Sequence, residues 1–221
     1  MKKRLKIAVI GLGNFGNEIV KNLYEMGHEV IAIDNRTDLV QEIQPYATIA
    51  ITLDATDKDS LEEASLANVD IGIISIGKSM ESSILATLYS KEIGVKHVIV
   101  KALSQSHEKI LKAIGADEII FPEKEMARTL ASKVGKEDIF QVTYFSNGFA
   151  IIEMKSPEFL TGKSLIESKV RNKYGVFIVG IKKPLEEQPT LLPSPEIVIE
   201  QDDILIVMGE ESSIKRFQEA S

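Results

Sequence analysis

Six residues near the start of the chain have the types and spacing needed to bind a phosphate. Gly11-Leu-Gly-Asn-Phe-Gly16 fits the pattern G-x-G-x-x-G, and it lies between an apolar run at 6–10 and an amphipathic run at 14–26. In a strand-loop-helix, the first glycine permits a tight turn and the second lets the backbone approach a pyrophosphate, while the third lets helix and strand pack closely. The free amides of the helix N-terminus then face the phosphates. Asn14 and Phe15, inside the loop, are candidate contacts too.

An acidic residue follows this loop at the distance expected for a ribose ligand. Asp34 ends the second apolar run, 29–33, and its carboxylate can bind ribose hydroxyls and would repel a 2′-phosphate. Asn35 and Arg36 come next, and the cationic Arg36 means that a phosphorylated ribose is not ruled out as the ligand. The alternative is that the glycines only make a turn and Asp34 only caps a helix. The order strand, glycine motif, helix, strand and acid favours a nucleotide.

Further candidates follow later strands, whose carboxyl ends would meet at the same sheet edge. Asp54-Ala55-Thr56 could lie beside the base or ribose, although Thr56 or Asp57 could equally be the N-cap of the next helix. Ser75-Ile76-Gly77 lies at the end of the fourth strand, where a glycine lets a ligand come close. Lys101 ends the fifth, where it would face the phosphates or be a solvated strand end.

Short apolar runs alternate with amphipathic ones through the first 134 residues, and the runs are rich in Ile and Val. This pattern predicts an α/β fold, a Rossmann-like doubly wound parallel sheet with helices on both faces. The expected strands are 6–10, 29–33, 48–52, 71–75, 98–101 and 118–121, and the expected helices are 14–26, 57–66, 79–93, 104–114 and 123–134.

The rhythm breaks at Gly135–Asp138, which predicts a nucleotide-binding domain over 1–136 and a small α+β domain over 137–221. In the second, we expect paired strands at 140–145 and 149–154 around a turn at 146–148. A helix at 163–172, strands at 176–182 and 204–208, and a final helix after Gly209 complete it. Four prolines between 184 and 195 predict a loop.

Composition limits the function. The chain has 221 residues, a net charge of −7 and no cysteine, and its three histidines are scattered. Disulfides and thiolate chemistry are therefore excluded, and binding of nucleic acid is disfavoured, as is a nucleotide-responsive transcription factor. No apolar run approaches the roughly 20 residues that span a bilayer, so we expect a soluble, cytoplasmic protein without direct membrane insertion. The second part has no histidine to serve as an acid or base, which favours a nucleotide sensor over an NAD-dependent oxidoreductase, the alternative.

Several motifs together resemble one family over essentially the full length. They are Ile10–Gly16, Gly27–Val30 leading to Asp34, Asp54–Asp57, Ile114–Glu123, Val170–Gly175 and Gln201–Leu205. The run Ile114–Glu123 is the most telling, because dehydrogenases have no reason to carry it. On these residues the chain resembles the regulator-of-potassium-conductance (RCK) proteins of KtrA/TrkA type, the cytosolic gating subunits of Ktr/Trk potassium uptake systems.

The resemblance implies a regulatory subunit, not an enzyme. Such proteins form homodimers that assemble into an octameric ring beneath a membrane potassium channel subunit, so the chain would lie in the cytoplasm at the inner face of the membrane. ATP and ADP would favour different ring shapes, which requires different affinities for them. Trk-type members respond instead to NAD(H).

The resemblance also assigns roles to residues. The phosphate loop falls on Gly11, Gly13 and Gly16, the ribose acid on Asp34, the base contacts on Asp54, Ala55 and Thr56, and a phosphate-facing lysine on Lys101. Glu123 matches a glutamate near the terminal phosphate that is linked to Mg²⁺ or Na⁺; alternatively it is a helix N-terminal carboxylate after Pro122. Asn14 departs from the family's arginine, which weakens discrimination of ATP from ADP and makes NAD(H) or AMP more plausible.

Many relatives bind cyclic di-AMP in the C-terminal domain, and the match here is partial. Leu165, Ile166 and Arg171 fit the pattern and Ile178 fits an apolar wall. Lys169 and Phe177 stand where an acid and an asparagine are expected. The alternative is that Leu165, Ile166 and Ile178 are core residues and Arg171 forms a surface ion pair.

Overall fold

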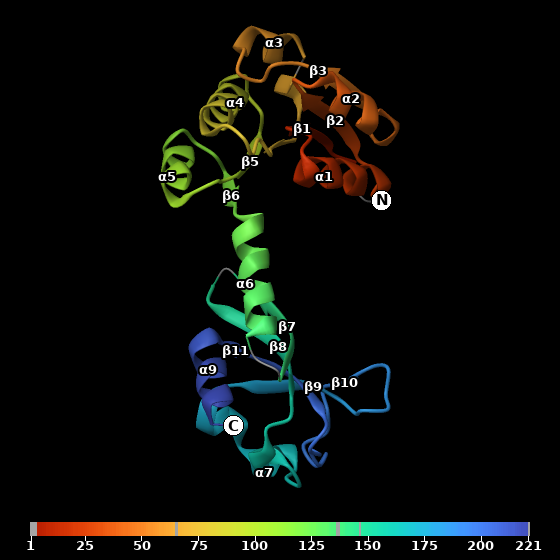
Figure 1. Cartoon of the computed structure of the whole chain (residues 1–221), viewed down its shortest axis with the longest axis vertical. Helices are drawn as coiled ribbons and strands as arrows, with labels where there is room; N and C mark the ends of the chain where they lie inside the picture. The colour runs from red at the N-terminus through yellow and green to blue at the C-terminus, as the bar shows by residue number, and fades with distance from the viewer. Residues whose placement is uncertain (1–3, 65, 136–137, 146, 221) are drawn as a thin grey trace. The chain divides into compact units, whose positions relative to one another are not determined.

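The computed structural model describes residues 4–64, 66–135, 138–145 and 147–220. The chain divides into two compact units between Pro122 and Glu123 (Figure 1). The predicted boundary lay at 136/137. The difference arises because α6 (Pro122–Val134) is held by the second unit: Arg128 forms an ion pair with Glu211, and the Ser132 and Tyr144 hydroxyls lie 2.7 Å apart.

The first unit is built on a six-stranded parallel sheet in the order β3-β2-β1-β4-β5-β6. The strands are β1 (Lys6–Ile10), β2 (Glu29–Asp34), β3 (Ile49–Thr52), β4 (Ile71–Ile74), β5 (His97–Lys101) and β6 (Glu118–Ile120). This order reverses between β1 and β4, which is where doubly wound sheets bind ligands. The predicted Rossmann-like fold is confirmed.

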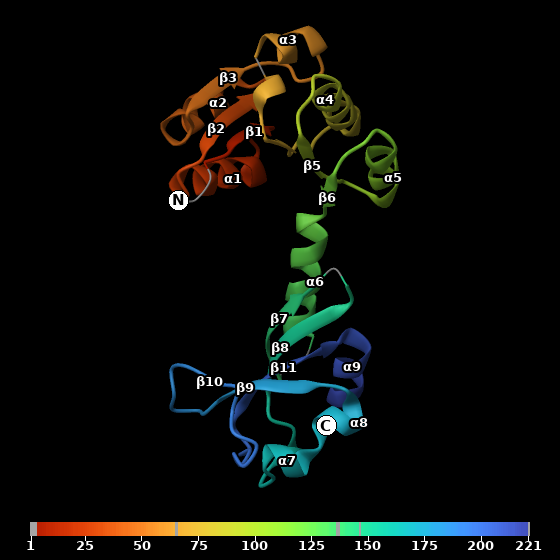
Figure 2. The same ribbon diagram turned by 180° about the vertical axis from the view of Figure 1, so that it is seen from behind.

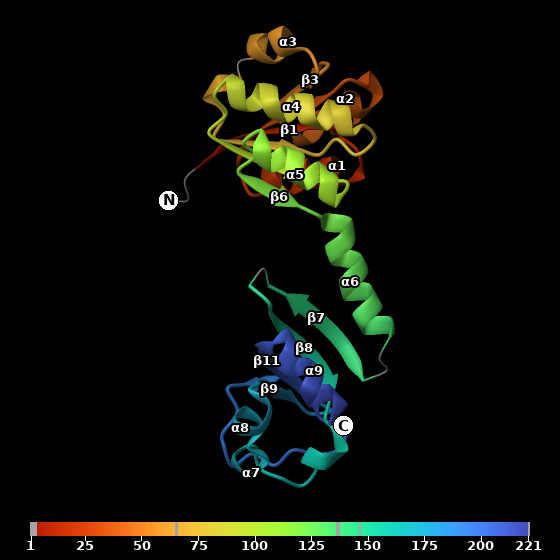
Figure 3. The same cartoon turned by 90° about the vertical axis from the view of Figure 1, so that its left-hand side faces the viewer.

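Helices cover both faces of this sheet, because successive residues of its buried strands point to opposite sides. Ile7 and Val9 of β1 pack with α1 (Asn14–Glu25) and α2 (Thr37–Ile43), whereas Ala8 and Ile10 pack with the helices of the other face. Those helices are α3 (Lys58–Glu63), α4 (Met80–Glu92) and α5 (Gln105–Ala113), of which α4 and α5 lie in front in Figure 3. Short 3₁₀ turns, η1 (Gln44–Tyr46) and η2 (Leu66–Asn68), complete the unit. The sequence did not predict α2, and α3 ends earlier than the expected 57–66.

The second unit carries an antiparallel sheet in the order β10-β9-β11-β8-β7 (Figure 2). Its strands are β7 (Ile139–Tyr144), β8 (Phe149–Lys155), β9 (Phe177–Lys182), β10 (Thr190–Leu191) and β11 (Ile204–Glu210). Short helical elements, η3 (Glu158–Leu160), α7 (Leu165–Ser168) and α8 (Val170–Tyr174), precede β9, and α9 (Glu211–Glu219) follows β11. The rings of Phe159, Tyr174 and Phe217 pack together beside the sheet.

Two predictions for the second unit need correction. The single helix at 163–172 is wrong, because Lys169 adopts a left-handed backbone conformation (φ 49°, ψ 28°) that separates α7 from α8. The proline-rich loop contains a short strand, β10, which pairs with Gly180 and Ile181 of β9. The predicted β7–β8 pairing is present. Ser146 of the predicted turn lies outside the described residues.

Candidate nucleotide site

Two glycines of the loop are required by the fold itself. Gly11 has φ +96°, and a Cβ built there would lie 3.0 Å from the backbone nitrogen of Ile76. A Cβ at Gly16 would lie 1.9 Å from the Gly11 carbonyl oxygen, so a side chain would push the helix off the strand. Ser75, for which the sequence predicted no role of its own, donates its hydroxyl to that same carbonyl. Its only sequence signal is a hydroxyl residue at the end of a buried strand.

Gly13 is different, because nothing in the described chain requires a glycine there. Its φ of −63° is open to any residue, and an added Cβ would meet no atom within 4 Å. Gly13 is the N-cap of α1, where Ser, Thr, Asp or Asn would stabilise the helix by accepting a backbone hydrogen bond. Glycine at this exposed position instead keeps the helix N-terminus clear, which is what a phosphate approaching the backbone needs.

The Asp34 side chain is hydrogen-bonded to the backbone of the glycine loop. Its side chain is only 8% exposed, and Oδ2 accepts a 2.7 Å hydrogen bond from the Leu12 amide. Oδ1 accepts from the Arg36 amide at 3.0 Å and from Arg36 Nε at 3.3 Å. A carboxylate has about four acceptor positions, so these three bonds leave room for one ribose hydroxyl. Arg36 stands beside the acid at this edge, while Asn35 is exposed.

Lys101 meets the glycine loop at the same sheet edge. Its Nζ lies 5.8 Å from the centre of the Phe15 ring, and a Cβ built at Gly77 would lie 3.2 Å from that nitrogen. The residue is 8% exposed, so the alternative of a freely solvated strand end is wrong. Ile76 packs partly against the core, and only Gly77 of the pair is exposed. The fold therefore gathers Phe15, Gly77 and Lys101.

The 54–57 segment divides between structure and site. Asp57 is the N-cap of α3 and accepts from the Asp59 amide at 3.2 Å, and the Ala55 methyl is buried in the core. Asp54 Oδ1 accepts from the Thr56 amide at 2.9 Å and its hydroxyl at 2.7 Å, which lowers the pKa of Asp54. Asp54 therefore stays charged. Its side chain is exposed, and it lies beside the end of β2, because the amide of the neighbouring Leu53 donates to the Asp34 carbonyl oxygen.

Glu123 is exposed in the first turn of α6, where the helix dipole favours a carboxylate. It belongs to the second unit, so the fold of the first unit does not gather it with the glycine loop. Among the described residues, no three His, Asp or Glu side chains are grouped so that they could hold a metal ion.

The C-terminal candidates lie at α7, α8 and β9. Leu165 and Ile178 pack against the core, whereas Ile166 is 65% exposed. The Arg171 guanidinium lies 4.8 Å from the centre of the exposed Phe177 ring, so its described contact is with an aromatic face and not an ion pair. The alternative interpretation, that these side chains are core residues, is therefore correct for Leu165 and Ile178 and wrong for Ile166.

The Gln201–Leu205 motif has a structural role. Asp203, within Gln201–Leu205, is fully buried, and its Oδ2 accepts from Lys183 Nζ at 3.0 Å and from the Glu200 amide at 2.8 Å. This ion pair between the buried Asp203 and the partly exposed Lys183 joins the segment before β11 to the end of β9.

Comparison with known proteins agrees with both units. The TrkA-N domain model matches residues 7–122 and the TrkA-C domain model matches 149–221. Ktr system potassium uptake protein A of Bacillus subtilis (strain 168) is 38% identical over 216 residues, covering 98% of this chain and 96% of that protein. Protein C of the same system and organism is 40% identical over 218 residues, covering 99% and 97%.

A solved structure of the GsuK RCK domain has the same fold. It superposes with a TM-score of 0.64 at 18% identity, covering 99% of this chain and 48% of that chain. In the part of this chain that the structure describes, none of the helices has the length and apolar character that crossing a membrane would require.

Proposed function

We propose that this chain, which belongs to the RCK family of KtrA/TrkA-type potassium uptake proteins, is a nucleotide-responsive regulatory subunit of a potassium uptake system. Support comes from two relatives, each about as long as this chain, that carry that system's name. The proposal assigns the chain a binding role: nucleotide would shift its conformational equilibrium, and no bond would be broken.

The observation that carries the nucleotide assignment is Gly13. The fold explains Gly11 and Gly16 by itself, but it leaves Gly13 in open space at the N-terminus of α1. A ligand whose phosphates approach the backbone there accounts for the missing side chain. Around it, the Lys101 ammonium would neutralise the phosphates and Asp34 would accept from the ribose. The edge at Asp54 and Thr56 would receive the base or ribose.

The adenine nucleotides ATP and ADP are the proposed ligands, with NAD(H) as the alternative. Asn14 is exposed at the first position of α1, where the family's arginine would provide a cation for the terminal phosphate. Without that charge, selection of ATP over ADP would be weaker. Glu123 is the proposed carboxylate for Mg²⁺ or Na⁺ at the nucleotide, reached in an assembly of several chains.

The assembly is part of the proposal. Homodimers would form an octameric ring that binds a membrane channel subunit of Ktr/Trk type, which would place the chain at the cytoplasmic face of the membrane without an anchor of its own. Cyclic di-AMP is the proposed second ligand, at the surface formed by Ile166 and Arg171. The exposed Arg171 guanidinium supports it because a phosphodiester is an anion that arginine binds well.

Calorimetric titration of nucleotide-stripped protein with ATP, ADP and NADH, with and without Mg²⁺, tests the proposal. We expect ATP or ADP to bind saturably and Gly13→Ala to abolish binding while the protein stays folded. Potassium uptake should then be measured in cells that express the cognate membrane subunit together with either the unmodified chain or the Gly13→Ala variant. Failure of all three nucleotides to bind would contradict the proposal, and a clear preference for NADH would favour the alternative.

A further inference from the structure

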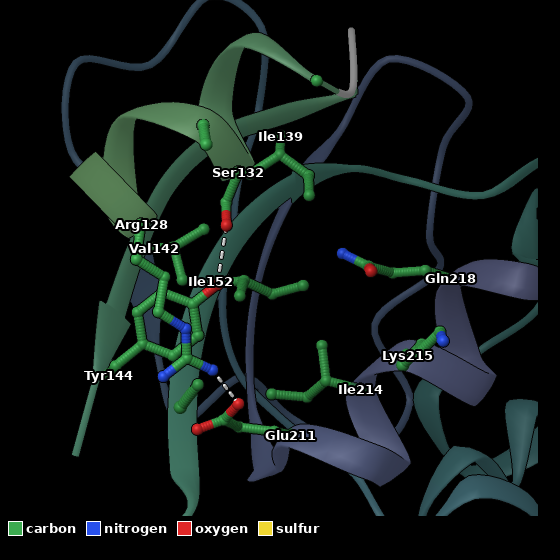
Figure 4. A pocket seen from close by; sticks show the side chains of 13 residues that line it. Arg128, Ser132, Ile139, Val142, Tyr144, Ile152, Glu211, Ile214, Lys215 and Gln218 are labelled. Atoms are coloured by element: carbon green, nitrogen blue, oxygen red, sulfur yellow. Dashed lines mark hydrogen bonds and ion pairs between the residues drawn. The ribbon is translucent and has the colours of Figure 1, made fainter. Parts of the chain in front are cut away.

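A pocket in the second unit is lined by none of the candidate nucleotide or cyclic di-AMP contacts. It has a volume of about 510 Å³ and lies between α6, the β7–β8 pair and α9 (Figure 4). The lining residues are Arg128, Ala131, Ser132, Gly135, Ile139, Val142, Tyr144, Ala150, Ile152, Glu211, Ile214, Lys215 and Gln218. The volume falls in the range of roughly 300–1,000 Å³ that is usual for small-molecule sites.

The floor of the pocket is apolar and fixed. Ile139 and Val142 of β7, Ile152 of β8 and Ile214 of α9 are each 6% exposed or less, and they belong to the core of the second unit. Figure 4 shows Ile139, Ile152 and Ile214 reaching into the space between α6 and α9. Such a floor favours the apolar body of a ligand, at about 25 cal/mol per Å² of apolar surface removed from water.

One end of the pocket carries an arginine that is oriented by its neighbours. The Arg128 guanidinium lies 3.6 Å from the centre of the Tyr144 ring and pairs through Nη2 with Glu211. The Tyr144 hydroxyl lies 2.7 Å from the Ser132 hydroxyl, so α6 is held to β7 at two points. A guanidinium has five N–H donors, and the bond to Glu211 occupies only part of them.

A second cation, Lys215, lies on the α9 side beside Gln218 (Figure 4). Its side chain is 73% exposed, and its ion pair with Glu219 is long, at 3.7 Å. The lining therefore holds two cations and one carboxylate, a net charge of +1 in a chain whose net charge is −7. Glu219, the partner of Lys215, lies outside the lining, so the groups that face the ligand are in cationic excess, which favours an anionic ligand at the rim of an apolar pocket.

We propose that this pocket binds a small anionic amphiphile, a carboxylate with a compact apolar body. The body would lie on the isoleucine and valine floor, and Lys215 would donate to the carboxylate at the rim, with Arg128 adding to the positive potential of the pocket. The inference goes beyond the proposed function and does not depend on it, because no nucleotide-site residue lines the pocket.

Octanoate tests the charge and the apolar body together, with octylammonium as the probe of opposite charge. Calorimetry on the full chain should show saturable binding of one octanoate per chain, and octylammonium binding at least about tenfold weaker. Lys215→Gln should weaken octanoate binding about fivefold or more. Lys133→Gln, on α6 but outside the pocket lining, should leave binding unchanged.

Ala131→Trp would fill the pocket from its exposed rim without disturbing the core, and it should abolish octanoate binding. Ala127→Trp on the same helix is the matched control. Equal affinity for octanoate and octylammonium, or unchanged binding in Ala131→Trp, would overturn the proposal. A change in sedimentation velocity in Ala131→Trp alone would also overturn it, because a second copy of the chain would then occupy the pocket. Nucleotide titration of the same samples reports on the glycine loop separately.

Discussion

The Asp34 carboxylate accepts a 2.7 Å hydrogen bond from the amide of Leu12, which lies 22 residues earlier in the chain. This bond joins the end of β2 to the glycine loop between β1 and α1. The same carboxylate accepts from Arg36, so one buried acid both shapes the loop and stands where a ribose would bind. The structural role of Asp34 and the binding role proposed for it are therefore coupled.

We expect Asp34→Asn to weaken both the stability of the fold and the binding of nucleotide. The amide keeps an acceptor for Leu12 but loses the ion pair with Arg36 and the charged acceptor for a ribose hydroxyl. We expect the free energy of unfolding to fall by about 1–3 kcal/mol and the affinity for ADP to fall about tenfold or more, measured by urea titration and calorimetry. Asp38→Asn, on the exposed first turn of α2, is the control and should change neither.

Gly13→Ala and Gly16→Ala should separate binding from folding. At Gly13 an alanine fits without contact, so we expect a stability loss below about 1 kcal/mol together with lost nucleotide binding. At Gly16 the added Cβ meets the Gly11 carbonyl, so the folded protein should be lost or strongly destabilised. Thermal unfolding and calorimetry measure the two effects. Nucleotide binding by Gly13→Ala at unchanged affinity would show that no ligand approaches the backbone there.

Asn14→Arg should restore a cation at the terminal phosphate. We expect the ratio of ATP to ADP affinity to rise about tenfold, because a charge-assisted contact is added only with ATP. The control is Asn22→Arg, which places the same charge on the exposed side of α1. An equal gain in affinity for ATP and ADP would mean that an arginine at position 14 acts by non-specific electrostatic attraction and not by contact with the terminal phosphate.

His107 should make stability depend on pH. Its ring is fully buried, its Nδ1 accepts from the Leu103 amide, and burial lowers the pKa of His107 below its usual value. The unfolded chain takes up a proton near pH 6.5 that the folded chain resists, so the free energy of unfolding should fall as the pH drops below about 6.5. His107→Gln keeps an acceptor but does not titrate there. Urea titrations from pH 7.5 to 5.5 should show a shallower fall in this variant, and equal slopes would contradict the assignment.

Arg171→Ala should weaken cyclic di-AMP binding about tenfold or more by removing the guanidinium that lies over Phe177. Phe177→Asn should strengthen it, because it supplies the amide that the family pattern has at this position. Lys173→Ala, also exposed on α8, is the control in calorimetry. Unchanged affinity in Arg171→Ala would move the ligand away from this surface.

The sequence by itself determined the first unit and most of its candidate site. Runs of Ile and Val separated by amphipathic stretches specify buried parallel strands, because each side of such a strand faces a helix. The order of the glycine loop, α1, β2 and Asp34 is local, so spacing alone located it. Lys101 and Gly77 were predicted in the same way, because Lys101 ends β5 and Gly77 follows β4, and the carboxyl ends of these neighbouring parallel strands share one edge.

Only the tertiary structure decided the contacts between distant segments, because local periodicity carries no information about them. It showed that Gly13 alone of the three glycines is not required by the fold, and that Ala55 and Asp57 serve the core and a helix cap. It also grouped α6 with the second unit through Arg128 and Glu211, 83 residues apart. The pocket beside that pair depends on elements that only packing brings together.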